Sequence, residues 1–111
     1  VPLALDDGGA HGLARYHAAA ALVSNHAVGL VDAGVELLTR AGLDRSQATR
    51  ALADLLASTA ANLKQVGLPD ALTGPIARGD WETVDAHVRA IHEEAPDLEP
   101  MYLALAEATR V

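Results

Sequence analysis

The stretch YHAAAALVSNHAVGLVDAGVELLTRA, residues 16–41, decides the fold of this chain. It is helix-forming throughout, and no Asp, Glu, Lys or Arg occurs between Tyr16 and Val31. A helix that is apolar on every side is normally buried on every side, and a rise of about 1.5 Å per residue gives this one a length on the order of 40 Å. The stretch therefore predicts one long buried central helix in an all-α bundle.

A membrane-spanning helix is the main alternative for the same stretch, because such a span needs about 20 mostly apolar residues. Polar side chains occupy its centre, at Ser24, Asn25 and His26, and charged side chains follow at Asp32 and Glu36. This pattern fits the hydropathy of a membrane span poorly. We therefore expect no membrane association.

The composition limits the classes of function. The chain has 111 residues, half of them apolar, which is enough for one domain with a core. Its formal net charge of −7 and pI near 5.0 argue against binding nucleic acid. The absence of cysteine excludes disulfides and thiolate zinc sites. Together with the lack of a secretory signal, it indicates a cytoplasmic protein.

Residues 1–12 are predicted to be a strand or linker that leaves a missing N-terminal domain. The apolar run from Val1 to Leu5 is followed by a turn-forming Asp-Asp-Gly-Gly cluster, and one strand alone cannot form a sheet. Residues 13–111 are predicted to be a helical domain. Its first helix should end at Ala41, with Gly42 as a left-handed C-terminal cap.

The second helix has the clearest signals of the chain. Asp44 is placed to cap its start, with Gln47 three residues later, and Gly67 marks its end. Apolar residues and one threonine recur at helical spacing along one face: Leu52, Leu55, Leu56, Thr59, Leu63 and Val66. The short connection to the first helix predicts two antiparallel neighbours.

The remainder is predicted to be a turn-rich segment and two further helices. Residues 68–80 contain two prolines and two glycines, with room for one helical turn. Such a segment is either a functional loop or a plain connector. Asp80 should cap the next helix, which ends before Pro96, and Asp97 should cap the last one.

The candidate site residues of the central helix are polar side chains in an apolar surrounding. His17 and Ser24 are seven residues apart, which places them on one face of a regular α-helix, and Asn25 adjoins Ser24. They are either buried polar groups with hydrogen-bond partners that fix the helix register, or a polar site facing a cleft.

Motifs of self-sufficient catalysis are absent from the sequence. It contains no Gly-x-Gly-x-x-Gly, no Walker loop, no His-Glu-x-x-His and no Gly-x-Ser-x-Gly. The five histidines do not follow a ligand spacing: His87 and His92, for example, are five residues apart and point to different helix faces. We therefore predict no metal site.

Several motifs together resemble a known family. They are Tyr16-His17-Ala18-Ala19-Ala20, Ser24-Asn25, Leu72-Thr73-Gly74-Pro75, Arg78-Gly79-Asp80 and, seven residues later, His87. In this order and spacing they resemble the helical C-terminal domain of the Rossmann-like, DUF2520-containing proteins. That family is similar to 6-phosphogluconate dehydrogenase, ketopantoate reductase and pyrroline-5-carboxylate reductase. The resemblance covers essentially the whole chain.

This resemblance implies one half of an NAD(P)-dependent oxidoreductase that acts on a small molecule. A Rossmann domain upstream would bind NAD(P), while this 6-phosphogluconate dehydrogenase C-terminal-like half would contact the substrate and form a homodimer interface. This chain alone would bind no cofactor. The catalytic residues implied are His17 and Asn25, and the substrate-binding residues are Ser24, Thr73, Arg78 and His87.

One departure from the relatives leaves two functions open. In ketopantoate reductase and 6-phosphogluconate dehydrogenase the long helix carries a catalytic Lys four residues before an Asn. If Asn25 matches that Asn, Ala21 stands at the Lys position and cannot transfer a proton. His17, one turn earlier, is the ionisable group nearby that could replace it. The chain is then either the substrate half of a reductase or a dimerisation module without catalysis.

Overall fold

The computed structural model describes residues 11–110, which form five helical segments without a strand. The first is one continuous helix made of α1 (Gly12–Ala20), the π-helical turn η2 (Ala21–Asn25) and α2 (His26–Arg40). The others are α3 (Arg45–Val66), α4 (Pro75–Arg78), α5 (Trp81–Glu94), and the 3-10 turn η3 (Pro96–Leu98) leading into α6 (Glu99–Ala108). The all-α prediction is confirmed. The predicted N-terminal strand lies outside the described residues.

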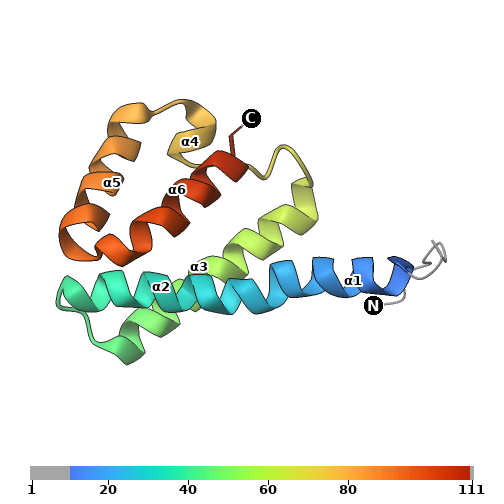
Figure 1. Ribbon diagram of the computed structural model, residues 1–111, viewed down its shortest axis with the longest axis horizontal. Coiled ribbons are helices and arrows are strands. Elements are labelled where there is room, and N and C mark those ends of the chain that lie inside the picture. The colour runs from blue at the N-terminus through green and yellow to red at the C-terminus, as the bar shows by residue number, and fades with distance from the viewer. Residues whose placement is uncertain (1–10, 111) are drawn as a thin grey trace.

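The elements gather around one half of the long helix (Figure 1). Helix α3 crosses α2, and the α5–α6 pair lies beside the C-terminal part of α2, while α1 extends away from them. The described chain is accordingly elongated, with extents of 48 × 32 × 27 Å. Among residues 11–110, one half of the central helix therefore has close neighbours, and the other half has no substantial contact with the other helices.

A tight turn reverses the chain between α2 and α3. Gly42 adopts a φ of 99°, which a residue with a Cβ rarely adopts, and its N–H donates to the Thr39 carbonyl at 3.0 Å. The N–H of Leu43 donates to the Leu38 carbonyl, also at 3.0 Å. The predicted glycine cap is confirmed, and it makes α2 and α3 sequential neighbours.

Helices α2 and α3 approach each other most closely at Gly34. A Cβ built on Gly34 would lie 2.8 Å from Cδ1 of Leu52, closer than real Cβ contacts. Val35 and Ala48, near this crossing, are 2% and 0% exposed. The absence of a side chain at Gly34 therefore allows the contact on which the bundle is built.

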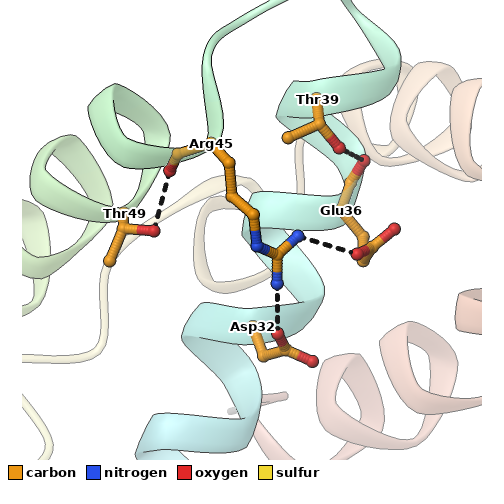
Figure 2. A network of polar contacts seen from close by, with 5 residues as sticks. All are labelled: Asp32, Glu36, Thr39, Arg45 and Thr49. Carbon is orange, nitrogen blue, oxygen red and sulfur yellow. Dashed lines mark hydrogen bonds and ion pairs between the residues drawn. The ribbon is translucent and has the colours of Figure 1, made fainter.

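Arg45, the first residue of α3, ties the start of that helix to α2 (Figure 2). One of its terminal nitrogens donates to Asp32 and the other to Glu36, both at 3.0 Å. Asp32 and Glu36 are one turn apart on α2, so the guanidinium spans them. All three side chains are largely exposed. The cluster therefore orients the two helices more than it stabilises them.

The predicted helix caps are confirmed at two of three positions. The carboxylate of Asp44 accepts from the Gln47 N–H at 3.1 Å, and that of Asp80 accepts from the Thr83 N–H at 3.2 Å. The predicted cap at Asp97 is wrong, because Asp97 lies inside η3 and Leu98 precedes α6 without a side-chain cap. Prolines in the first turns of η3 and α6 have no N–H to satisfy, so a carboxylate cap is less needed.

The expectation that the central helix is buried is wrong for the single chain. Of its large apolar side chains only Val35 is buried within the described residues, while Leu22, Val23 and Val28 are 65%, 71% and 70% exposed. The reason is geometric, since α3 crosses α2 instead of running alongside the whole helix, and α5 and α6 reach only its C-terminal part. The apolar pattern was read correctly, but one chain supplies too few neighbours to cover it.

By length and composition alone, the helix Gly12–Arg40 could also cross a membrane. An 18-residue window has a mean hydropathy of 1.3, and 6% of that window is buried. One such helix is weak evidence, and Ser24, Asn25 and His26 interrupt its apolar surface.

Filling the space at Gly34 should separate α2 from α3. We expect Gly34→Leu to lower the free energy of unfolding by about 1–3 kcal/mol, because the new side chain overlaps Leu52. Gly29→Leu on the same helix, where a Cβ meets nothing within 4 Å, should raise it by about 0.5–1 kcal/mol. Urea unfolding of both variants measures the difference. Equal effects would mean that the close approach does not determine the packing.

Candidate functional site

The polar residues of the central helix lie at and before its irregular turn. Ser24 and Asn25 are the last two residues of η2, and His17 lies in the last turn of α1. All three are exposed in the chain. They are therefore not buried register-fixing groups in the single chain, and they are accessible to a partner or ligand.

The π-helical turn changes how these residues share a face. Within η2 the N–H of His26 bonds to the carbonyl of Ala21, five residues earlier, so this turn holds one residue more than an α-turn. The seven-residue spacing of His17 and Ser24 therefore does not give the shared face that it gives in a regular helix. π-Helical turns are frequent at functional sites, which adds an independent reason to examine this position.

The π turn also affects the comparison with the reductases that the sequence resembles. Ala21 and Asn25, which the sequence comparison would align with their Lys and Asn if Asn25 matches that Asn, are the first and last residues of η2. Their side chains are therefore related by an irregular turn and not by the i, i+4 relation of an α-helix.

A second candidate region is a groove on the covered half of the domain, with His87 and Tyr102 in its wall. A cavity of about 450 Å³ lies between α2, α5 and α6, and one of about 360 Å³ lies between the α4 region, α5 and α6. Both cavities are lined by His87 and Tyr102. Volumes of this size are typical of small-molecule sites. We refer to the first as the α2–α5 groove.

His87 and Tyr102 form a hydrogen-bonded pair across the α5–α6 hairpin. Nδ1 of His87 lies 2.9 Å from the Tyr102 hydroxyl oxygen, and the two rings meet edge to face with centroids 6.0 Å apart. The pair forms because α5 ends at Ala95 and η3 turns the chain back, so α6 runs past α5. Depending on the imidazole tautomer, either the ring or the hydroxyl has a proton left to donate.

Burial at the groove affects the ionisation of Tyr102. Withdrawal of the phenol from water disfavours its charged form and raises the pKa of Tyr102 above its ordinary value. The hydroxyl therefore stays protonated and can donate or accept hydrogen bonds throughout the neutral range.

Arg40 and Glu94 stand at the end of the α2–α5 groove. An N–H of the Arg40 guanidinium donates to the main-chain oxygen of Glu94, which links the C-terminal ends of α2 and α5. Both residues line the cavity. The groove thus has a hydrogen-bonding pair in its wall and one cation and one carboxylate at its rim.

The loop residues predicted to contact substrate separate into two groups. Thr73 lines the smaller cavity together with His87. Arg78 lies 3.9 Å from Asp80 in an exposed ion pair and lines none of the cavities described here. Hydrogen bonds from Thr83, assisted by the charge of Arg78, lower the pKa of Asp80. Arg78 therefore supports the cap of α5 in this chain.

The single chain brings together Thr73 and His87 but not these two with His17, Ser24 and Asn25. Helix α1 and η2 make substantial contacts only within the long helix, whereas His87 lies on α5 beside α2 and α6. Tyr102 and Arg40 are groove residues that sequence reasoning missed. No sequence signal connects Tyr102 to His87, because their pairing depends on how the α5–α6 hairpin folds. Among residues 11–110, no group of three potential metal ligands is found.

Comparison with known proteins gives one match. The family model described as "Domain of unknown function (DUF2520)" matches residues 11–109, nearly the whole chain. No curated protein and no solved structure gives a significant match. The resemblance found in the motifs is therefore confirmed at the level of the family, while the relation to particular reductases is not.

Titration of Tyr102 provides a test of the groove. In a Tyr16→Phe background Tyr102 is the one remaining tyrosine, and its ionisation followed by ultraviolet absorbance should occur above pH ~10, the ordinary value. Because the folded pKa is the higher one, the stability it contributes is fully present below pH ~10 and is lost as the pH rises through the folded pKa. Tyr102→Phe should abolish this loss. Ionisation at or below the ordinary value would contradict the burial of the ring.

Proposed function

Since the chain belongs to the DUF2520 family, we propose that it is the helical domain of an NAD(P)-dependent oxidoreductase. In this proposal an upstream Rossmann domain binds the dinucleotide, and the present domain provides contacts to a small carbonyl or imine substrate and a homodimer interface. The description of the family assigns no reaction, so the proposal depends on the motifs and on the site geometry.

The observation that carries the proposal is an exposed apolar helix with a polar, irregular turn in its middle. Leu22, Val23 and Val28 on this helix are each at least 65% exposed, and apolar surface of this extent marks an interaction site. Ser24 and Asn25 lie among them in η2. A partner that covers the apolar residues would enclose these polar groups, which creates a cleft of the kind that binds a polar substrate.

The starts of α3, α5 and α6 are poorly suited to a dinucleotide. A pyrophosphate binds at the N-terminus of a helix that follows a glycine-rich turn. Helices α3 and α5 begin instead with the capping carboxylates of Asp44 and Asp80, and α6 has Glu99 in its first turn. These negative groups would repel a phosphate, so the proposal assigns the dinucleotide entirely to the upstream domain.

A second copy of the chain is the partner that we propose for the uncovered half of the helix. Symmetric pairing of two such helices would bury the apolar residues of both at once. We further propose that the pairing brings the Thr73 and His87 region of one protomer toward η2 of the other. Lipid is a poorer cover, because Ser24, Asn25 and His26 would lose their hydrogen bonds to water.

The alternative function is a dimerisation module without catalysis. It is favoured by Ala21, which stands at the lysine position of the reductases that the sequence resembles if Asn25 matches their Asn, and by η2, which disturbs the geometry of that position. In this case Ser24 and Asn25 would form hydrogen bonds across the dimer interface and have no role toward a substrate.

A measurement of self-association tests whether a second copy of the chain covers the exposed central helix. We expect sedimentation equilibrium to give a dimer, and Val28→Glu, which places a charge on the exposed apolar helix, to weaken it by about tenfold or more because the charge must be desolvated. Ala60→Glu on the exposed face of α3 is the matched control. A wild-type chain that stays monomeric at high micromolar concentration would overturn the dimer.

Catalysis is tested in a longer protein that includes the upstream domain. This protein should bind a nicotinamide dinucleotide, and His17→Ala should reduce turnover by about 100-fold or more if His17 is the proton donor. Asn25→Ala should also lower turnover while leaving the melting temperature nearly unchanged, because both side chains are exposed. Loss of stability in both variants, together with no dinucleotide binding by calorimetry, would favour the dimerisation module.

A further inference from the structure

The α2–α5 groove is an apolar feature of the domain that the polar helix turn does not explain. Its apolar lining includes Leu37 of α2, Ala41 directly after that helix, and Ala90 and Ile91 of α5. The two alanines leave the space, since a larger side chain at either position would project into it. The volume of about 450 Å³ falls within the range of pockets that hold small organic molecules.

Hydrogen-bonding capacity in the wall of the groove comes from the His87–Tyr102 pair. The Tyr102 hydroxyl and Nδ1 of His87 are 2.9 Å apart, and their bond uses one proton. In either tautomer of the imidazole the pair keeps a further donor for a ligand: the hydroxyl proton when Nδ1 donates, or Nε2–H when Nδ1 accepts. A ligand with an acceptor oxygen is therefore matched at this wall.

The charged groups at the groove disfavour an anion, and Arg40 opposes the attraction that Glu94 would have for a cation. Arg40 contributes one positive charge and Glu94 one negative charge, and both line the same cavity. The nearby ends of α2 and α5 are helix C-termini, whose partial negative charge opposes an anion. The chain as a whole carries a net charge of −7, which also disfavours an anion. A charged ligand would lose its hydration here without a dedicated counter-charge.

We infer that the α2–α5 groove is a binding site for a small, uncharged, largely apolar carbonyl compound. Its apolar body would lie on Leu37, Ala41, Ala90 and Ile91, and its oxygen would accept a hydrogen bond from the His87–Tyr102 pair. Binding is a property of this domain by itself and needs neither the upstream domain nor the dinucleotide. Only the step of calling the bound compound a substrate rests on the function proposed above.

Three probes of nearly equal shape test the ligand class. They are 4-phenyl-2-butanone, 3-phenylpropanoate and 3-phenylpropylammonium, which carry a neutral carbonyl, an anion and a cation on the same phenylethyl body. The protein is titrated with each, and the backbone amide signals are followed by two-dimensional ¹H–¹⁵N NMR. We expect saturable shifts at Leu37, Ala90 and Ile91 with the ketone, and at least about tenfold weaker binding of both ions, equivalent to the cost of desolvating an uncompensated charge.

Two variants locate the ketone. The double variant Tyr102→Phe/His87→Phe removes the free donor in either tautomer, so ketone affinity should fall about fivefold, the usual effect of one hydrogen bond. Ala90→Leu should weaken binding by about tenfold or more, because the added side chain fills the groove. Ala60→Leu, at an exposed alanine of α3 that lines none of the described cavities, is the matched control and should leave the affinity unchanged.

Several results would overturn the inference. They are ketone shifts that do not saturate, equal binding of ketone and carboxylate, or an unchanged affinity in the double variant Tyr102→Phe/His87→Phe. Shifts at the groove that appear on raising the protein concentration without a probe would show that a second copy covers it. Because no dinucleotide is present, failure here leaves the oxidoreductase proposal standing, and failure of dinucleotide binding in the longer protein leaves this site standing.

Discussion

The close approach of α2 and α3 at Gly34 is the constraint on which the rest of the structure depends. With no side chain at that position, the Leu52 methyl group can occupy the space where a Cβ would stand, and the two backbones cross there. Val35 and Ala48 are buried near the crossing, and the Gly42 turn and the Arg45 bridge fix the relative direction of the helices. A crossing, unlike a parallel contact, protects only the part of each helix near the crossing point.

The domain is consequently divided into a covered half and a bare half. On the covered half, α5 and α6 pack beside the end of α2, and their contacts create the groove with the His87–Tyr102 pair. On the bare half, α1 and η2 expose apolar side chains around Ser24 and Asn25. The two candidate sites therefore differ in what they need. The groove on the covered half requires only a small molecule, whereas the site at η2 requires another protein surface to cover it.

The sequence predicted those features that depend on neighbouring residues. Asp44 and Gly67 set the limits of α3 because capping and left-handed glycine are local effects. It could not predict burial, which depends on how many other elements reach a helix, nor η2, because the residues around Ser24 look like ordinary helix formers. The pairing of His87 with Tyr102 could not be predicted from the sequence either, because it depends on the path of the chain through η3.

Because of the π turn, the direction in which the side chains of α1 point relative to α2 depends on a single residue. Each α-helical residue advances the helix by about 100°, so the extra residue between Ala21 and Asn25 rotates α1 relative to α2 by roughly that angle. A one-residue deletion in this turn could restore a regular helix with the composition almost unchanged. Every side chain of α1, His17 included, would then point to a different side of the molecule. The length of this turn thus fixes the rotation of α1 relative to α2 about the axis of the long helix.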